Sequence, residues 1–272
     1  MIKAEYISHM GSDLTVVNSD WSSDVCSSDL VYENHYLTDT DVANYARQSF
    51  AKLAENFTAD QNANLIKFLA RGMASGDWQE LIESMGCHST LEDAHEMAVY
   101  LRSIPEHWVP FAHPQITLRM RAPVPITVQC YKHKIGFVES GESRRYIKSA
   151  PILFIPNEFR AAAENVKQGS GGVHPESELW RSTYIRKCME MIDTYLVAVN
   201  SGVCPEQARF FLPQGVELNW VWTGSLYAFA NAYNQRSDSH AQREIQDLFE
   251  DISEIIEPLY PISWAALTQG AY

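Results

Sequence analysis

The sequence predicts an α+β fold in which a small antiparallel sheet packs beside a layer of longer helices. Three short stretches, near residues 114–121, 147–156 and 215–222, have the apolar patterns of strands. Three longer stretches, at residues 58–72, 175–200 and 223–236, carry apolar residues at helical spacing. With 272 residues, 46% of them hydrophobic, the chain can form one large domain or two small ones.

Charge and cysteine content exclude several classes of protein. A formal net charge of −13 argues against nonspecific binding of nucleic acid or of an anionic membrane, so an anionic ligand needs a local basic pocket. The five cysteines are odd in number and contain no C-x-x-C pair, which disfavours a disulfide framework and a zinc site. The chain has no apolar run long enough to span a bilayer and no secretory leader at its start. We therefore expect a cytoplasmic protein without a bound metal.

The first thirty residues differ from the rest of the chain. Residues 20–30, D-W-S-S-D-V-C-S-S-D-L, resemble a translated sequencing adaptor, although a natural Ser/Asp linker has the same composition. Residues 11–18 are also echoed by residues 39–44. We expect residues 1–30 to be an artefactual or disordered leader, and residues 31–272 to form a single domain.

The first half of that domain contains helices and one clear strand. Leu65, Ile66 and Leu69 recur at helical spacing after Thr58, which predicts a helix that ends near Gly72. Helical pattern continues through residues 73–103 around Cys87-His88, a pair of adjacent residues that we interpret as structural because no third group orients them. Apolar residues then alternate with polar ones over residues 114–121, as in a strand with one buried face.

The stretch from Pro125 to Tyr146 concentrates cations and hydrogen-bonding groups. Proline favours the first turn of a helix, and on such a helix Gln129, Lys132 and His133 share one face. The chain then loosens through two glycines before hydroxyl and guanidinium groups return. The set suits a phosphate, although such residues are also common on a solvated surface.

The remaining elements of the chain are predicted from shorter sequence patterns. Residues 147–156 read as a strand that ends at a proline, and residues 168–172 as a flexible loop that lacks a phosphate-binding glycine motif. Residues 175–200 form a long helical pattern, and Gly202 supplies its stop. A further helix is expected between Thr223 and Arg236.

Several separated motifs resemble those of the flavin-dependent thymidylate synthases. That family has R-H-R, a spacer and N-E-x-S-x-R-Y where this chain has Lys132-His133-Lys134 and Ser140-Gly141-Glu142-Ser143-Arg144-Arg145-Tyr146. Its P-F-E-H segment is similar to residues 110–113, P-F-A-H, and its E-x-A-R-x-x-L-P to residues 206–213. Its A-R-V-S-F is similar to residues 46–50. The resemblance covers residues 31–261, and the order and spacing of its motifs coincide with those of the family.

The resemblance implies both an activity and a set of site residues. The family makes dTMP from dUMP, with methylenetetrahydrofolate as the carbon donor and NADPH as the reductant acting through FAD. By resemblance, the dUMP site consists of Gln129, Lys132, Ser143, Arg145, Arg209 and Arg236. Within that set, the catalytic residues that stabilise charge on the pyrimidine are Lys132, Arg209 and Arg236. The FAD contacts are His113, Thr117, His133, Lys134, Ser225 and Asn231. The family also implies a homotetramer with shared active sites.

The chain departs from the family pattern at several of these positions. Lysine at 132 and 134 keeps the charge of arginine but lacks its planar fork. The carboxylate of N-E-x-S is displaced, which leaves Glu139 and Glu142 as candidates for its role, and Ser225 stands where asparagine is common. Cys130 is expected to pack in the core, because no base is placed to activate it.

Three hypotheses remain open from the sequence. The first is an FAD-dependent thymidylate synthase, which would show bound flavin and uridylate-dependent consumption of NADPH. The second is a dUMP- and flavin-binding homologue without turnover, and the third is a chimera whose first thirty residues impair folding. A cysteine-dependent thymidylate synthase is disfavoured because its catalytic-cysteine motif is missing. The choice between NADPH and NADH and the strand order are not fixed by the sequence.

Overall fold

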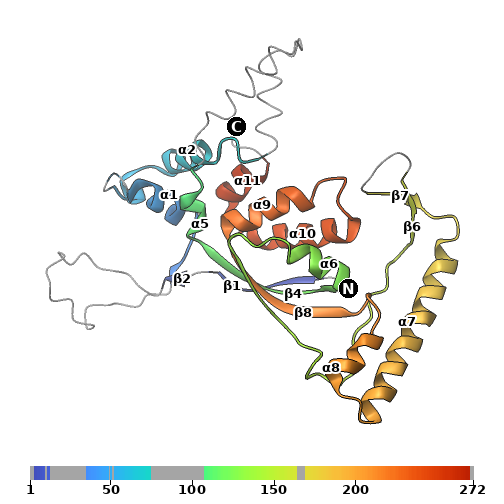
Figure 1. Ribbon diagram of the computed structural model, residues 1–272. Coiled ribbons are helices and arrows are strands. Elements are labelled where there is room, and N and C mark those ends of the chain that lie inside the picture. Colours follow the sequence, from blue (N-terminus) through green and yellow to red (C-terminus); the bar gives the residue numbers. More distant parts are fainter. Residues whose placement is uncertain are drawn as a thin grey trace, which may run out of the picture. The chain divides into compact units, whose positions relative to one another are not determined.

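The structure, a computed structural model, describes residues 3–9, 11–12, 35–48, 50, 52–74, 107–163 and 169–269 (Figure 1). The chain divides into two compact units. Unit 1 comprises Met1–Ile7, Leu118–Thr223 and Ala232–Ile255, and unit 2 comprises Ser8–Thr117, Gly224–Asn231 and Ile256–Tyr272. The adaptor-like residues 20–30 and the Cys87-His88 pair lie outside the described residues.

The sheets and helices together give the mixed α+β fold that the sequence predicts. The largest sheet has the strand order β1-β4-β8-β5, formed by Lys3–His9, Gln115–Pro123, Glu217–Ser225 and Phe137–Gly141. Two further sheets are antiparallel pairs, β2 (Gly11–Ser12) with β3 (His35–Tyr36), and β6 (Arg160–Ala162) with β7 (Ser170–Val173). Strand β1 therefore places part of the first thirty residues at an edge of the main sheet.

Strands β4 and β8 confirm two of the three predicted strands. In β4 every second residue is fully buried, namely Ile116, Leu118, Met120 and Ala122. In β8 the large buried residues are Trp220 and Trp222, again two positions apart. A period of two puts these side chains on one face of each strand, so the alternation in the sequence marks the side that packs into the core.

The predicted strand at residues 147–156 is wrong. Only Leu153 pairs there, through an isolated antiparallel bridge to Val216, with backbone bonds on either side of it. Pro151 and Pro156 lie within the segment on either side of this bridge, and a proline cannot donate a hydrogen bond to a ladder. The edge strand next to β8 is instead β5, which follows the two lysines in the sequence.

The helix predicted from Pro125 is confirmed, but the face assigned to it is wrong. Helix α6 runs from Val124 to Cys130, and Tyr131 caps it by donating its N–H to the Thr127 carbonyl. The backbone then turns, and Gly136 takes a positive φ of 78°. Lys132 and His133 thus lie beyond the helix, so helical spacing does not set where their side chains lie.

Unit 2 contains the helices nearest the two ends of the described chain. They are α1 (Asp39–Gln48), the 3-10 turn η1 (Ala54–Asn56), α2 (Ala59–Ala70), α5 (Val109–Ala112) and α11 (Pro261–Thr268). Helix α2 is the predicted 58–72 helix, and Thr58 and Gln61 form a capping box at its start. The Asp39 carboxylate accepts bonds from the N–H groups of Ile262 and Ser263, over 2.8 and 2.9 Å. It therefore ties α1 to the first turn of α11.

Unit 1 carries α7 (Ser177–Asn200), the longest helix in the described part of the chain, which confirms the prediction for residues 175–200. Gly202 takes a φ of 95° just after this helix, as a helix stop requires. Helix α8 (Pro205–Ala208) and the 3-10 turn η2 (Arg209–Phe211) contact α7 beside its end (Figure 1). The predicted loop at 168–172 is wrong in part, because Ser170 begins β7.

Two helices follow β8. Helix α9 (Leu226–Arg236) is the helix predicted before Arg236, and its residues continue from unit 2 into unit 1. Helix α10 (Arg243–Ile256) buries a stripe at helical spacing, formed by Ile245, Leu248, Phe249, Ile252 and Ile256. Of the helices in the described part of the chain, none is both long and apolar enough to cross a membrane.

Candidate functional site

Three predicted site residues meet at the end of α9 in unit 1. Arg236, the last residue of that helix, donates from Nε to His133 Nε2 over 2.9 Å. Its Nη2 donates to the backbone carbonyl of Gln129 over 3.3 Å. These two bonds fix the guanidinium plane and leave its other N–H groups for a ligand. We call Arg236, His133 and Gln129 the α9 cluster.

The Arg236 contact determines the protonation state of His133. A guanidinium only donates, so Nε2 of His133 accepts and the ring hydrogen of the neutral imidazole lies on Nδ1. Burial, together with the charge of Arg236, lowers the pKa of His133 to about 4. At neutral pH the α9 cluster therefore carries the charge of Arg236 alone.

Cys130 lies next to this cluster in sequence but is not available as a nucleophile. Its side chain is fully buried, and burial raises the pKa of the thiol to about 12. Only the thiolate is strongly nucleophilic, so this cysteine is inert at neutral pH. The structure thus supports a packing role for Cys130.

A second group of predicted residues lies around Glu206 in α8. Arg145 pairs with the Glu206 carboxylate at 3.7 Å, and Arg209 Nε donates to the Glu206 carbonyl over 3.2 Å. The Ser143 hydroxyl accepts from the Arg145 N–H over 3.4 Å. About half of the Arg145 side chain is exposed, 51%, and Arg209 is exposed as well. We call Ser143, Arg145 and Arg209 the α8 cluster.

The lysines that replace arginine differ in their surroundings. Lys132 is exposed. Lys134 pairs with Glu139 at 2.5 Å, and its side chain is 63% exposed. Glu142 instead accepts from the Asn219 side chain over 2.9 Å, which joins it to β8. Two carboxylates could replace the family glutamate. Glu139 pairs with Lys134, a predicted cofactor residue, whereas Glu142 accepts a hydrogen bond from strand β8.

Four of the predicted flavin contacts lie in unit 2, whereas His133 and Lys134 lie in unit 1. The exposed His113 ring stacks on Tyr45, with centroids 4.5 Å apart. Ser225 is buried and its hydroxyl accepts the Ala228 N–H over 3.2 Å, so it caps α9. Thr117 on β4 and Asn231 on α9 are both partly exposed.

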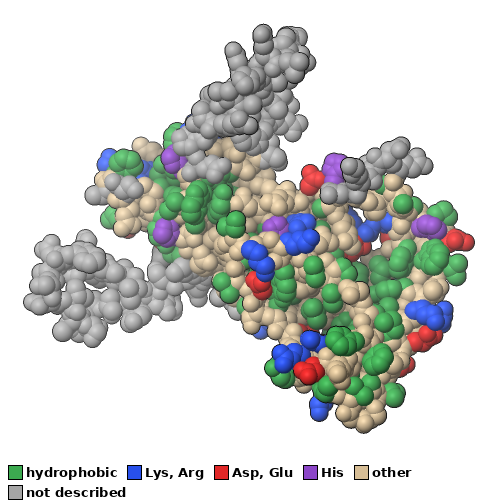
Figure 2. All heavy atoms as spheres, in the orientation of Figure 1, with side chains coloured by type: hydrophobic (Ala, Val, Ile, Leu, Met, Phe, Trp, Pro, Cys, Tyr) green, Lys and Arg blue, Asp and Glu red, His purple; other side chains and the backbone are tan. Residues whose placement is uncertain are grey.

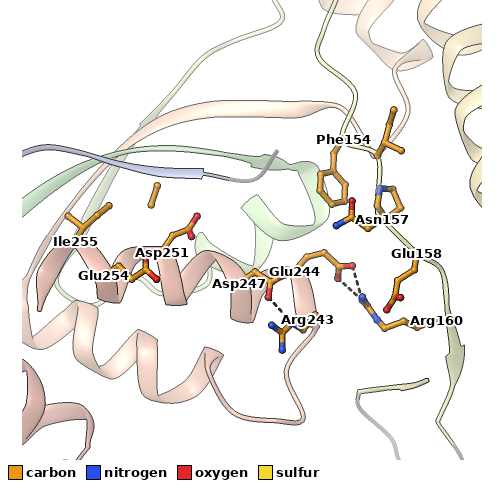
Figure 3. A pocket seen from close by; sticks show the side chains of 13 residues that line it. Phe154, Asn157, Glu158, Arg160, Arg243, Glu244, Asp247, Asp251, Glu254 and Ile255 are labelled. Atoms are coloured by element: carbon orange, nitrogen blue, oxygen red, sulfur yellow. Dashed lines mark hydrogen bonds and ion pairs between the residues drawn. The ribbon is translucent and has the colours of Figure 1, made fainter. Parts of the chain in front are cut away.

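Two cavities lie in unit 1, and none of the twelve predicted site residues lines either one. The larger, of about 1090 Å³, lies along α10 and exposes five carboxylates (Figure 3), namely Glu158, Glu244, Asp247, Asp251 and Glu254. The smaller, of about 390 Å³, shares Arg160 and Glu244 with it. The acidic lining of the larger cavity disfavours a nucleotide phosphate, and no predicted dUMP residue lines the smaller one, so the uridylate is not assigned to either cavity.

Sequence reasoning missed the side chains that support Gln129. Its amide donates to Gln242 over 2.9 Å, Gln242 donates to Glu244 over 2.8 Å, and Arg160 donates to Glu244 over 2.7 Å. Nothing in the sequence pairs Gln242 and Glu244 with Arg160, which lies more than eighty residues earlier. Among the described residues, no group of three or more His, Cys, Asp or Glu is arranged to hold a metal ion.

Comparisons with known proteins agree on one family. Residues 34–262 match the family described as thymidylate synthase complementing protein. A flavin-dependent thymidylate synthase from Thermosipho africanus is 29% identical over 174 residues, which cover 61% of this chain and 73% of that protein. The enzyme of the same name from Thermotoga neapolitana is 30% identical over 166 residues, 61% of this chain and 72% of that protein.

A solved structure shares the fold. The crystal structure of a UMP/dUMP methylase, PolB from Streptomyces cacaoi with bound 5-Br dUMP, superposes with a TM-score of 0.67 at 19% identity. The superposition covers 98% of this chain and 94% of that one. The family match extends over most of the chain, from before α1 into α11. The chain therefore belongs to the thymidylate synthase complementing protein family.

Proposed function

We propose that the protein is an FAD-dependent thymidylate synthase that converts dUMP to dTMP with methylenetetrahydrofolate as the carbon donor and NADPH as the reductant. The observation that carries the proposal is Arg236, whose guanidinium is fixed by His133 and by the Gln129 carbonyl. A fixed cation of this kind stabilises charge that develops on a bound pyrimidine. The family membership supports the same assignment.

The residues present fit FAD. FAD offers flat aromatic rings and a pyrophosphate, and the exposed His113 ring stacked on Tyr45 provides an aromatic face in unit 2. Lys134 and the Nδ1–H of His133 provide a cation and a donor in unit 1. Thr117, Ser225 and Asn231 complete the set of residues that the family resemblance assigns to the cofactor. When bound, FAD would supply the reducing equivalents from NADPH.

In this proposal the α8 cluster binds the phosphate of the uridylate and the α9 cluster contacts its pyrimidine. Arg145 and Arg209, with Ser143 and Lys132, offer exposed cations and a hydroxyl suited to a phosphate. In the α9 cluster, Arg236 directs a fixed positive charge at the pyrimidine as its carbon becomes nucleophilic. Cys130 takes no part, because its thiol stays protonated. The methyl group is thus added to the pyrimidine without an enzyme thiolate.

The proposal includes a homotetramer with shared active sites. Unit 1 exposes large apolar side chains on α7 and η2, namely Leu179, Trp180, Val197 and Phe210. Figure 2 shows hydrophobic side chains among charged ones over this part of the surface. The Phe210 side chain is 79% exposed and follows Arg209 of the α8 cluster directly. Large exposed apolar patches are typical of interfaces. Light scattering coupled to gel filtration measures the subunit number, and a monomer at working concentration would contradict this part of the proposal.

The test is dTMP formation by the purified full-length protein with dUMP, methylenetetrahydrofolate, FAD and NADPH. We expect dTMP only when FAD and NADPH are both present. Because NADPH supplies the electrons, the folate should leave as tetrahydrofolate and not as dihydrofolate. A parallel reaction with UMP tests whether the activity extends to the ribonucleotide named for the PolB methylase.

One alternative has support from a specific observation. Lysine replaces arginine at both 132 and 134, which favours a homologue that binds dUMP and flavin without turnover. Calorimetric binding of dUMP with no dTMP formed would select this alternative. Product formation would exclude this alternative and show that lysine at 132 and 134 can replace the arginines of the family motif.

The division of the chain at residue 31 stays a prediction. Because Lys3–His9 forms edge strand β1, a chain that lacks residues 1–30 loses one strand of the main sheet. If residues 31–272 form the whole working domain, the shortened chain keeps the melting temperature and activity of the full chain. A shortened chain that aggregates would show that β1 belongs to the domain.

A further inference from the structure

The Tyr131 side chain packs between strand β8 and Lys134. Its ring lies edge-on against the Trp220 ring, with centroids 5.8 Å apart and planes at 83°. The Lys134 ammonium lies 5.6 Å from the centroid of the Tyr131 ring, within the range of a cation–π contact. All three residues belong to unit 1. These contacts involve the ring, so they orient the side chain without using its hydroxyl.

The Tyr131 hydroxyl lies against Gly141, the last residue of strand β5. A Cβ atom at Gly141 would lie 2.9 Å from the hydroxyl oxygen, whereas the next neighbours would be 3.7 Å or more away. Gly141 has no positive φ, so its backbone does not itself require glycine. The family motif N-E-x-S has its glutamate at this position. The Tyr131 hydroxyl therefore occupies space that a side chain at position 141 would need.

This hydroxyl is available to a ligand as a donor. The side chain is partly exposed, and among the described residues none forms a hydrogen bond with the hydroxyl. Burial raises the pKa of Tyr131, and the negative charge of Glu139 raises it further. The hydroxyl is thus protonated at neutral pH and offers one O–H donor.

The residues around this hydroxyl favour an anion. Lys134 pairs with Glu139 at 2.5 Å, so the carboxylate that acts on the hydroxyl already has a cationic partner. Beyond Gly141 the chain continues directly to Ser143 and Arg145 of the α8 cluster. A fully ionised phosphate offers only acceptors, so a protonated hydroxyl beside these cations suits one of its oxygens.

We propose that Tyr131 is a further ligand-binding residue, whose hydroxyl donates a hydrogen bond to a phosphate oxygen beside Gly141. The proposal rests on the proposed function, which gives the protein two phosphate-bearing ligands, dUMP and FAD. An ionised glutamate at position 141 could only accept, so the tyrosine hydroxyl replaces an acceptor with a donor. The chemistry is the same for the phosphate of dUMP and the pyrophosphate of FAD, and the two arms of the test distinguish them.

The test is the dissociation constant of each ligand for the full-length protein, measured by calorimetry for FAD alone and for dUMP at saturating FAD. Tyr131→Phe removes the hydroxyl and keeps the ring against Trp220. We expect one ligand to bind about tenfold more weakly, as for the loss of one hydrogen bond to a charged group, and the other to stay within about twofold. The affected ligand without its phosphate, deoxyuridine or riboflavin, should bind wild type and variant equally.

Gly141→Ala tests the same space independently. Its Cβ must displace the hydroxyl, so this variant should weaken the same ligand about as much as Tyr131→Phe does. In the Tyr131→Phe background it should cause no further loss, because the remaining neighbours of that Cβ are 3.7 Å or more away. Because the backbone at Gly141 admits alanine, this variant keeps the test decisive should Tyr131→Phe fail to fold.

The matched control is Tyr184→Phe, which removes a hydroxyl of unit 1 that donates to the Phe154 carbonyl over 2.7 Å. It should lower the melting temperature and leave both dissociation constants within about twofold. Tyr131→Phe should do the reverse and keep the melting temperature of the ligand-free protein, because in the described part of the chain its hydroxyl has no hydrogen bond to lose.

Three results would overturn the role of Tyr131 alone. They are unchanged binding of both ligands by Tyr131→Phe, weaker binding of both, and an equal loss for a ligand and its phosphate-free form. Losses that add in the double variant would show that the hydroxyl and a side chain at position 141 do not share one space, which also overturns it. Binding of neither dUMP nor FAD by the wild type would overturn the proposed function and this inference together.

Discussion

The α9 and α8 clusters both contain arginine but hold it in different ways. Arg236 has two hydrogen bonds to fixed partners and lies beside a half-buried, neutral histidine. Arg145 has one ion pair of 3.7 Å, in which both side chains are about half exposed. A fixed guanidinium is already oriented when the substrate arrives, whereas an exposed one loses freedom on binding. The comparison suggests that the α9 cluster acts on the reacting ring and that the α8 cluster captures the anion.

The largest effect is expected from Arg236→Ala. The variant removes the fixed charge of the α9 cluster, and we expect kcat for dTMP formation to fall about 100- to 1000-fold, as for the loss of one preorganised donor. Steady-state rates at saturating dUMP measure the effect. Arg243→Ala is the matched control, because Arg243 lies on the exposed side of α10 and pairs with Asp247. A fall below tenfold for Arg236→Ala would remove the distinction between the clusters.

Arg145→Ala should weaken the binding of dUMP rather than slow catalysis. We expect KM for dUMP to rise about tenfold with kcat nearly unchanged. The rise should shrink at high salt, because salt screens the attraction between the exposed Arg145 and the phosphate of dUMP. The measurement is KM at low and high ionic strength. Arg186→Ala on α7, an exposed arginine paired with Glu190, serves as control. A large loss of kcat would show that the α8 cluster also acts in the chemical step.

His133 should make the stability of the protein depend on pH. Its pKa is about 4 in the folded protein and near 6.5 when unfolded, so below pH 6.5 the unfolded chain takes up a proton that the folded chain does not. The free energy of unfolding should therefore fall between pH 6.5 and pH 4, by about 1–2 kcal/mol after allowance for partial exposure.

Replacement of His133 tests this prediction. Denaturant unfolding of wild type and His133→Gln should converge as the pH falls, because the variant lacks this loss. His240→Gln, at an exposed histidine paired with Asp238, should follow the wild type. Parallel curves for wild type and His133→Gln would mean that His133 titrates normally in the folded protein.

The smallest effect is expected from Cys130→Ala. The thiol is buried and protonated, so its removal should change kcat by less than about threefold while lowering stability by roughly 1 kcal/mol. Rates and thermal unfolding measure the two quantities. Iodoacetamide should leave Cys130 unmodified in the folded protein and should modify the exposed Cys204. Loss of activity without loss of stability would contradict the packing role.

The sequence predicted the fold best where a strong local pattern coincides with burial. The alternation of Ile116, Leu118 and Met120 became β4, and Thr58 with Gln61 became the cap of α2. It failed at residues 147–156, where two prolines left only the Leu153 bridge. It also failed beyond Cys130, where the helix ends before Lys132 and His133. Local pattern carries no information on where a turn sends the next side chain.

By itself the sequence determined the α+β class, the family resemblance and the set of candidate residues, because these depend on residue types and their order. Only the tertiary structure decided which candidates meet. It joined His133 to Arg236, which is 103 residues later, and Gln129 to Gln242 and through it to Glu244 and Arg160. Contacts between distant residues are fixed by the packing of whole elements.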